Sequence, residues 1–237
     1  MGDGIYIATA GAVAQSTALD VTANNIAHAS TAGYQGARVT FSEALAKARS
    51  PDMALVGTNT GAVDATSGVI TQTGNPFDIA LDGPGYLVVD TPQGMRYTRA
   101  GALARGPDGA LHTADGHRVR NQGGGAIVLP SGATDISFAH DGAVLADGAE
   151  IGRLQLATFA PGAMTPEGAT LYAARGKPTE APPPRVVQGA LEGSNVNVVR
   201  GVVDLVRMSR TYESLIRVIQ GYSEIESRAA RDIGGPK

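Results

Sequence analysis

Apolar residues recur every three or four positions near the C-terminal end of the chain, which is the spacing of one helix face. Ser194, Asn195 and Asn197 precede this pattern. Side chains of these types accept hydrogen bonds from the free amides at a helix start. The pattern predicts a helix over residues 198–228, which would be roughly 45 Å long at 1.5 Å per residue. Its apolar stripe runs through Val198, Val202, Leu205, Tyr212, Ile216 and Ile219.

The N-terminal end carries a second pattern of the same kind, from Gly4 to about Ala29. The stripe contains Ile5, Ala8, Ala12, Leu19 and Ile26. The segment is rich in alanine, the strongest helix former. Because both terminal stripes are narrow and long, we predict that the two helices pair as a coiled-coil-like arm. The alternative is that they are two ordinary amphipathic helices packed on one globule.

The middle of the chain changes to the alternating pattern of strands. Phe77, Ile79 and Leu81 alternate with other residues, and a strand-like run follows at residues 86–89. Asp-Gly pairs, which favour tight hairpin turns, stand at positions 82–83, 108–109, 115–116, 141–142 and 147–148. Further strands are predicted at residues 95–99, 127–129, 136–138, 144–145 and 154–159. Short strands between such turns indicate an antiparallel β domain.

These patterns predict an α+β fold in which terminal helices form an arm around an inserted small antiparallel β domain. The arm takes residues 1–37 and 190–237, and the β domain takes residues 74–178. Residues 38–73 are expected to form an extended connecting segment. Three consecutive prolines at 182–184 make residues 179–189 a stiff connector.

The composition narrows the classes of function. A net charge of −3 argues against a general nucleic-acid partner. The chain contains no cysteine, so disulfides and zinc–thiolate sites are excluded. We expect no direct insertion into a membrane, because no apolar stretch has the length of a span. The start of the chain lacks the basic region of a cleaved secretory signal.

Catalytic motifs are not evident in the sequence, and we predict that the protein is neither an enzyme nor a cofactor binder. The rival interpretation is a metal site in which His112, His117 and Asp115 meet at one turn, since two imidazoles and one carboxylate are a minimal zinc set. His28 and His140 show no ligand spacing that would extend it. A carbohydrate- or peptide-binding β module with helical oligomerisation tails shares the same architecture and is a third interpretation.

Three stretches together resemble the flagellar axial family of rod, hook and hook-associated proteins. The first lies at residues 5–34 and includes Ala23-Asn24-Asn25-Ile26-Ala27. The second comprises residues 72–89 with Tyr97-Thr98-Arg99-Ala100-Gly101 and residues 113–116. The third is Leu191-Glu192-Gly193-Ser194-Asn195-Val196-Asn197, with Met208, Arg210, Tyr212 and Glu213 downstream. The resemblance covers nearly the whole chain, and the short insert before Gly74 is most similar to the proximal-rod subgroup.

This resemblance implies a structural subunit of the basal-body rod, which crosses the periplasm and transmits torque. The implied partners are other copies of the chain, neighbouring rod subunits and the flagellar type III export apparatus, which passes the chain without a cleaved signal peptide. A distal-rod or hook-type subunit is the alternative within the family. We predict that the assembly interface contains Ile5, Ala12, Leu19, Asn24, Asn25, Ile26, Asn195, Asn197, Val202, Leu205, Tyr212, Ile216 and Ile219.

Overall fold

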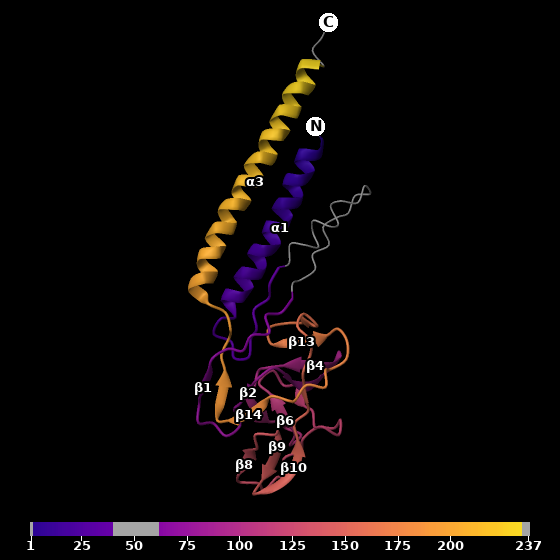
Figure 1. Cartoon of the computed structure of the whole chain (residues 1–237), viewed down its shortest axis with the longest axis vertical. Coiled ribbons are helices and arrows are strands. Elements are labelled where there is room, and N and C mark those ends of the chain that lie inside the picture. The colour runs from indigo at the N-terminus through magenta and orange to yellow at the C-terminus, as the bar shows by residue number, and fades with distance from the viewer. Residues whose placement is uncertain (1, 40–61, 234–237) are drawn as a thin grey trace. The chain divides into compact units, whose positions relative to one another are not determined.

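The computed structural model describes residues 2–39 and 62–233. The chain divides into two compact units, and the helical unit contains the two terminal helices (Figure 1). The β unit consists of Ala27–Arg38 and Thr60–Val196. The predicted α+β class, with a helix at each end and a β-rich middle, is confirmed. Residues 40–61 of the predicted connecting segment lie outside the described residues.

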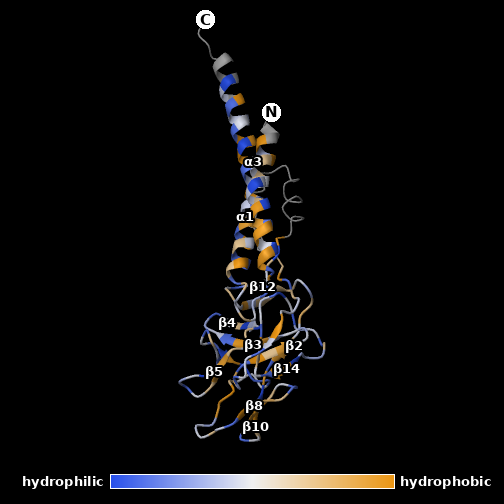
Figure 2. Cartoon of the chain, turned by 90° about the vertical axis from the view of Figure 1, so that its left-hand side faces the viewer, coloured by the Kyte–Doolittle hydropathy of each residue, from blue (hydrophilic) through white to orange (hydrophobic). Residues whose placement is uncertain are grey.

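Within residues 2–39 and 62–233 the helices are α1, Gly2–Ala27, and α3, Val198–Ile233. Both form where the apolar periodicity predicts them, and α3 continues past the predicted end at residue 228. Hydropathy differs between them in Figure 2, where α1 is mostly apolar and α3 alternates apolar with polar residues. Three exposed ion pairs on α3 join residues four positions apart, Arg200–Asp204, Glu213–Arg217 and Glu224–Arg228. Each adds a few tenths of a kcal/mol, about 0.2–0.5.

The largest sheet has eight strands and is antiparallel throughout. Its order is β12-β13-β4-β3-β7-β6-β5, and β11 also pairs with β3. The strands are β3 (Tyr86–Thr91), β4 (Gly94–Thr98), β5 (Leu103–Arg105), β6 (Leu111–Thr113), β7 (Arg118–Val119), β11 (Leu156–Ala157), β12 (Met164–Pro166) and β13 (Leu171–Ala174). The middle of the chain is therefore antiparallel β structure, as predicted.

Three smaller antiparallel sheets complete the β unit. One contains β8 (Ile136–Phe138), β9 (Ala143–Ala146) and β10 (Ala149–Arg153); the others pair β1 (Ile70–Gln72) with β15 (Ala190–Glu192) and β2 (Ile79–Asp82) with β14 (Arg185–Gln188). Three of these strands lie outside the expected 74–178 range, since β1 falls in the expected connecting segment, β14 in the expected connector and β15 in the expected arm. The proline run ends before β14, whose non-proline amides are free to pair with β2.

Two predicted strands are shorter or absent. Residues 127–129 form only an isolated bridge between Val128 and Ala110, although Ile127 and Leu129 are buried. Of the run predicted at residues 154–159, only β11 is a strand, and Leu154 forms a bridge with Asn121. Hydrophobic alternation reports which side chains are buried, whereas a strand also requires a partner backbone in register.

Strand β3 lies at the centre of the β unit, with buried side chains on both of its faces. Leu87 and Val89 belong to a large aliphatic cluster with residues such as Leu111, and Tyr86 and Val88 belong to a second cluster rich in tyrosine. Alternate residues of a strand point to opposite faces of its sheet. A continuous apolar run such as Tyr86–Val89 is therefore the sequence of a strand covered on both sides.

The Asp-Gly pairs form turns, but in two different ways. At Asp147-Gly148 both residues have positive φ, 49° and 83°, as a type I′ turn requires. In the other four pairs only the glycine has a positive φ. At two of these, Asp108 and Asp141, the carboxylate accepts a hydrogen bond from the backbone amide two residues later. Aspartate thus contributes through its side chain as well as through its tolerance of positive φ.

Candidate functional site

Within the helical unit, residues 11–26 of α1 contact residues 201–215 of α3. A Cβ atom on Gly201 would lie 2.9 Å from Ile26 Cγ1, and a Cβ atom on Gly11 would lie 3.6 Å from Leu215 Cδ1. Between them, the Thr22 hydroxyl is 3.6 Å from Met208 Sδ. Residue numbers fall along α1 as they rise along α3, so the two helices run antiparallel. Small residues at Gly11 and Gly201 allow the close approach.

The contacting positions on α3 lie beside the stripe predicted from the sequence. Gly201, Met208 and Leu215 face α1, and they are spaced by seven residues. The neighbouring stripe remains partly open: Val202 is 47% exposed, whereas Leu205, Tyr212, Ile216 and Ile219 are partly buried. On α1, Ala12 is buried, Asn24 is exposed, and Ile5, Leu19, Asn25 and Ile26 are partly buried.

A group of valines at the start of α3 is exposed to solvent in the single chain. Val198, Val199, Val202, Val203 and Val206 range from 45% to 77% exposed. We call these five residues the valine patch. Apolar side chains this close together on one helix are typical of a surface that another protein covers.

The two predicted interface asparagines have different roles. Asn197 caps α3, because its Oδ1 atom accepts a hydrogen bond of 3.0 Å from the amide of Arg200. Asn195 belongs to the β unit, and its side chain joins two separate segments there. Its Oδ1 accepts from the Gly36 amide at 2.8 Å, and its Nδ2 donates to the carbonyls of Asp64 and Thr66 at 2.8 and 2.9 Å.

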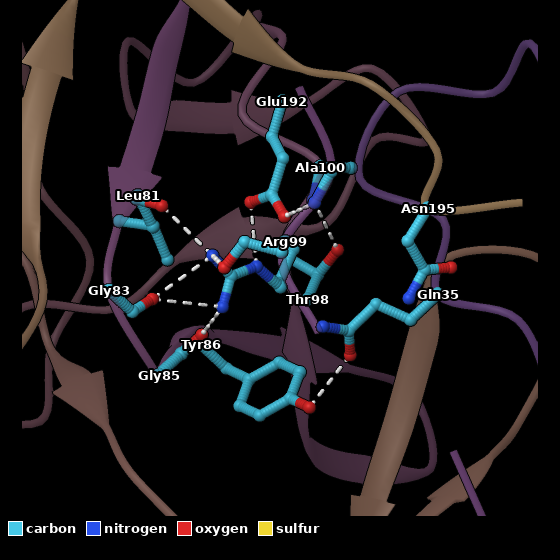
Figure 3. A network of polar contacts seen from close by, with 12 residues as sticks. Gln35, Leu81, Gly83, Gly85, Tyr86, Thr98, Arg99, Ala100, Glu192 and Asn195 are labelled. Carbon is cyan, nitrogen blue, oxygen red and sulfur yellow. Dashed lines mark hydrogen bonds and ion pairs between the residues drawn. The ribbon is translucent and has the colours of Figure 1, made fainter. Parts of the chain in front are cut away.

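Next to Asn195 lies a completely buried ion pair between Arg99 and Glu192. Arg99 Nε donates to Glu192 Oε2 at 2.7 Å, and both side chains are only 1% exposed. Figure 3 shows the guanidinium and the carboxylate facing each other. Burying two charges is costly unless they are paired and their other hydrogen-bonding positions are filled.

Every remaining donor of Arg99 is used. Nη1 donates to the carbonyls of Gly83 and Gly85 at 3.1 and 3.0 Å, and Nη2 donates to the carbonyl of Leu81 at 2.9 Å (Figure 3). Nη2 also contacts the Gly83 carbonyl and the Ser67 hydroxyl. A guanidinium has five N–H donors in a fixed plane. Arg99 therefore fixes the loop between β2 and β3 as well as Glu192.

Glu192 holds the other strands of the junction. Its Oε1 atom accepts from the amide of Gly68 at 2.8 Å, and its backbone carbonyl accepts from the amide of Gly33 at 2.8 Å. Gly33 has a φ of 73°, and a Cβ atom there would lie 2.3 Å from the Ala100 backbone nitrogen. Only glycine fits this position. The ion pair therefore joins parts of all three stretches that carry the family resemblance.

A tyrosine pair extends the junction towards the second core cluster. The Tyr86 hydroxyl donates to Gln35 Oε1 at 2.7 Å, and the backbone N–H of Gln35 donates to Tyr172 Oη at 2.8 Å. Burial raises the pKa of both Tyr86 and Tyr172 above the usual value of a phenol. Both hydroxyls thus stay neutral at physiological pH and act as hydrogen-bonding groups.

The residues proposed for a zinc site are used in a different way. His112 Nε2 lies 2.9 Å from Asp108 Oδ1, and its Nδ1 lies 3.0 Å from the carbonyl of Gly116. Both ring nitrogens are thus engaged within the chain. Among residues 2–39 and 62–233, no group of three or more His, Asp or Glu side chains is placed to hold a metal ion.

Two cavities in the β unit differ in size, and the larger one is lined in part by Gln155, whose buried Oε1 atom has no hydrogen-bond partner among the described residues. The cavity beside Tyr86 and Arg99 has a volume of about 30 Å³, which is room for roughly one water molecule. A more open cavity of about 320 Å³ runs along residues 154–158, and its charged residues Asp141 and Arg153 pair with each other at 2.9 Å. In the part of the chain that the structure describes, no helix is both long and apolar enough to cross a membrane.

Sequence reasoning included Arg99 and Glu192 in motifs but assigned no role to either. The sequence offers one indication of their role: each is the charged residue within a short run of uncharged residues, Tyr97–Gly101 and Gly189–Gly193. A charged residue next to a strand is normally solvated. Their pairing joins positions far apart in the chain, so it becomes visible only in the tertiary structure.

Comparisons with known proteins match the three stretches. Residues 5–35 match the family "Flagella basal body rod protein", residues 80–146 match "Flagellar hook protein FlgE/F/G D1 domain", and residues 187–232 match "Flagellar basal body rod FlgEFG protein C-terminal". The chain is thus similar to flagellar axial proteins over each of its motifs.

Whole-chain relatives agree with these matches. Flagellar basal-body rod protein FlgF of Escherichia coli (strain K12) is 34% identical over 248 residues, which cover 97% of each chain. FlgF of Rhizobium meliloti (strain 1021) is 29% identical over 246 residues and the full length of both chains. Flagellar basal-body rod protein FlgG of Agrobacterium fabrum (strain C58 / ATCC 33970) is 34% identical over 262 residues, covering 97% of this chain and 98% of the relative.

We predict that Glu192→Gln destabilises the β unit strongly. The substitution leaves the Arg99 charge buried without its counter-ion, and breaking a buried pair in this way typically costs about 3–5 kcal/mol. Chemical denaturation followed by circular dichroism measures the change. Glu150→Gln is the matched control, because Glu150 pairs with Arg153 at 3.5 Å while both side chains are exposed; its effect should stay below about 1 kcal/mol. Equal effects of the two substitutions would contradict the role of the buried pair.

A second prediction concerns acid stability. The backbone amide of Ala110, followed by His112 and Arg118, lowers the pKa of Asp108 from 3.8 to about 2. Because the folded-state pKa is depressed, the stabilisation is complete above 3.8 and is lost as the pH falls through about 2. In Asp108→Asn the unfolding midpoint should depend less on pH in that window, as measured by thermal denaturation at a series of pH values. An unchanged slope would show that the Asp108 carboxylate is not stabilised in the folded state.

Proposed function

Because the chain belongs to the flagellar basal-body rod protein family and is a structural subunit of the rod, we propose that it polymerises through its terminal helices into the proximal part of the helical shaft. Members of this family assemble with other rod subunits in the flagellar basal body. The proposal adds which surfaces make the contacts and where in the rod the subunit lies.

The valine patch is the observation that carries this proposal. Helix α1 contacts α3 through Gly201, Met208 and Leu215, so it leaves Val198, Val202 and their neighbours open. Complete burial of a valine contributes roughly 1.5–3 kcal/mol, so covering the exposed half of one adds about 1 kcal/mol. The patch as a whole would contribute several times that amount when neighbouring copies cover it.

We further propose that α1 and α3 form a coiled coil. The contacts of α3 with α1 recur every seven residues, which is the repeat of that structure. The two faces of α3 then differ, since one meets α1 and the other carries the valine patch. Different complementary surfaces on one subunit produce a helical assembly that continues, whereas one self-complementary surface closes into a dimer.

The proposed position in the proximal rod rests on the relatives named FlgF, which match the chain over 97% to 100% of its length. The similarity to FlgG of Agrobacterium fabrum supports a distal-rod subunit as the second candidate. Complementation separates the two, since the gene should restore motility to a strain that lacks its own proximal-rod subunit and not to one that lacks its distal-rod subunit.

We also propose that the chain reaches the rod through the flagellar type III export apparatus and spans the periplasm there without a cleaved signal peptide. Mass spectrometry of the subunit from purified basal bodies tests this part. An N-terminus that begins at residue 1 or 2 supports it, whereas removal of a longer N-terminal peptide contradicts it.

Val202→Asp and Ile216→Asp should each abolish incorporation into the rod while the β unit stays folded. Each substitution places a carboxylate on a face of α3 that neighbouring subunits cover, and a buried unpaired charge is strongly unfavourable. Basal bodies purified from a complemented deletion strain, together with swimming assays, give the measurement. Val128→Asp is the matched control, because Val128 is 60% exposed and lies in the β unit. Normal incorporation of both α3 variants would refute the proposed interface.

A further inference from the structure

Two chain segments that lead to the terminal helices are held together inside the β unit. The amide of Gly33 donates to the carbonyl of Glu192 at 2.8 Å, and the amide of Gly36 donates to Asn195 Oδ1 at 2.8 Å. The amide of Asn195 also approaches the Tyr34 carbonyl at 3.4 Å. We call this set of contacts between residues 33–36 and 192–195 the root clamp.

The root clamp is fixed to the rest of the β unit at several points. Asn195 Nδ2 donates to the carbonyls of Asp64 and Thr66, and Glu192 is held by Arg99 and by the amide of Gly68. A displacement of either segment would break these bonds together. These bonds therefore fix which residues of the 33–36 segment lie opposite which residues of the 192–195 segment, and we call this pairing the offset of the two segments.

The connections from the root clamp to the two helices are equally long. Helix α1 ends at Ala27, six residues before Gly33, and α3 begins at Val198, six residues after Glu192. The first contact between the helices, Ile26 with Gly201, comes immediately beyond these connections.

Helix α1 offers few large side chains with which to select its register against α3. It presents small residues at buried or partly buried positions, including Ala8, Gly11, Ala12 and Ala18. The positions of α3 that face it recur every seven residues but differ in size, so a slip by one repeat would set Met208 against Ile26 in place of Gly201. Such a slip moves one helix by about 10 Å relative to the other at 1.5 Å per residue.

We infer that Asn195 is a positioning residue whose side chain, within the root clamp, sets the register in which α1 and α3 pair. The inference rests on the proposed helix pairing and adds what selects one register among several. In this inference Asn195 makes no contact with the facing surfaces of α1 and α3, and it acts on them by holding residues 33–36 and 192–195 in one offset. The same offset would decide which side chains the subunit presents to its neighbours.

Disulfide trapping tests the inference, because the natural chain has no cysteine. Ile26→Cys with Gly201→Cys reports the native register: replacing Ile26 removes the atom that a Cβ on Gly201 would approach. Ile26→Cys with Met208→Cys reports a slip of seven residues. Each pair is made in the full chain, with and without Asn195→Ala, and the rate of intramolecular disulfide formation is measured at low protein concentration.

The native-register pair should oxidise rapidly in the parent chain and the slipped pair slowly. With Asn195→Ala the native-register rate should fall roughly tenfold and the slipped rate should rise, a change that corresponds to about 1.4 kcal/mol. Ser194→Ala is the matched control, since among the described residues the Ser194 hydroxyl accepts only from the nearby Val196 amide, and it should leave both rates unchanged. Unchanged rates with Asn195→Ala would overturn the inference.

Two further outcomes separate the inference from its premises. If neither cysteine pair oxidises in the parent chain, the helices do not pair, and the proposed coiled coil fails first. If Asn195→Ala unfolds the β unit, Asn195→Asp takes its place, because it keeps the acceptor for Gly36 but sets a carboxylate against the carbonyls of Asp64 and Thr66. A native-register rate in Asn195→Asp equal to that of the parent chain would then overturn the inference.

Discussion

The buried ion pair of Arg99 and Glu192 is the constraint on which the arrangement of the β unit depends. Two charges without access to water are tolerated only where every hydrogen-bonding position is filled. Meeting that condition brings together the β2–β3 loop, residues 67–68 and strand β15 at one place. A pair of this kind adds little net stability compared with apolar side chains of the same volume. Its effect is to exclude other arrangements of these segments, since any of them would leave a charge buried alone.

The same junction explains how chain ends separated by most of the sequence come to act together. Gly33 and Glu192 share a backbone hydrogen bond, and the connections from these residues to α1 and α3 have equal length. The alanine-rich helix α1 has few large side chains with which to select a partner position on α3. The opposite face of α3 carries five valines that are exposed in the single chain, and this is the surface through which we propose that neighbouring copies bind.

Polar side chains in the β unit serve the fold in every network described. Arg99, Glu192, Asn195 and His112 each form hydrogen bonds with backbone atoms or with other side chains of the β unit. A catalytic or ligand-binding group, in contrast, needs a free position directed into a cavity. The cavity beside Arg99 is the size of one water molecule. These observations agree with the structural role of the family to which the chain belongs.

Local periodicity by itself determined both helices, their approximate ends, the cap at Asn197 and the antiparallel β character of the middle, because these depend on neighbouring residues and on which side chains avoid water. It placed the apolar stripe of α3 beside the positions that actually face α1, since a stripe shows that a face is apolar but not which partner covers it. Strands β14 and β15, the failed strand at residues 127–129 and the roles of Arg99, Glu192 and Asn195 were decided only by the tertiary structure. Each of these features depends on a backbone or a charge from a distant part of the chain, and no pattern within one segment contains that information.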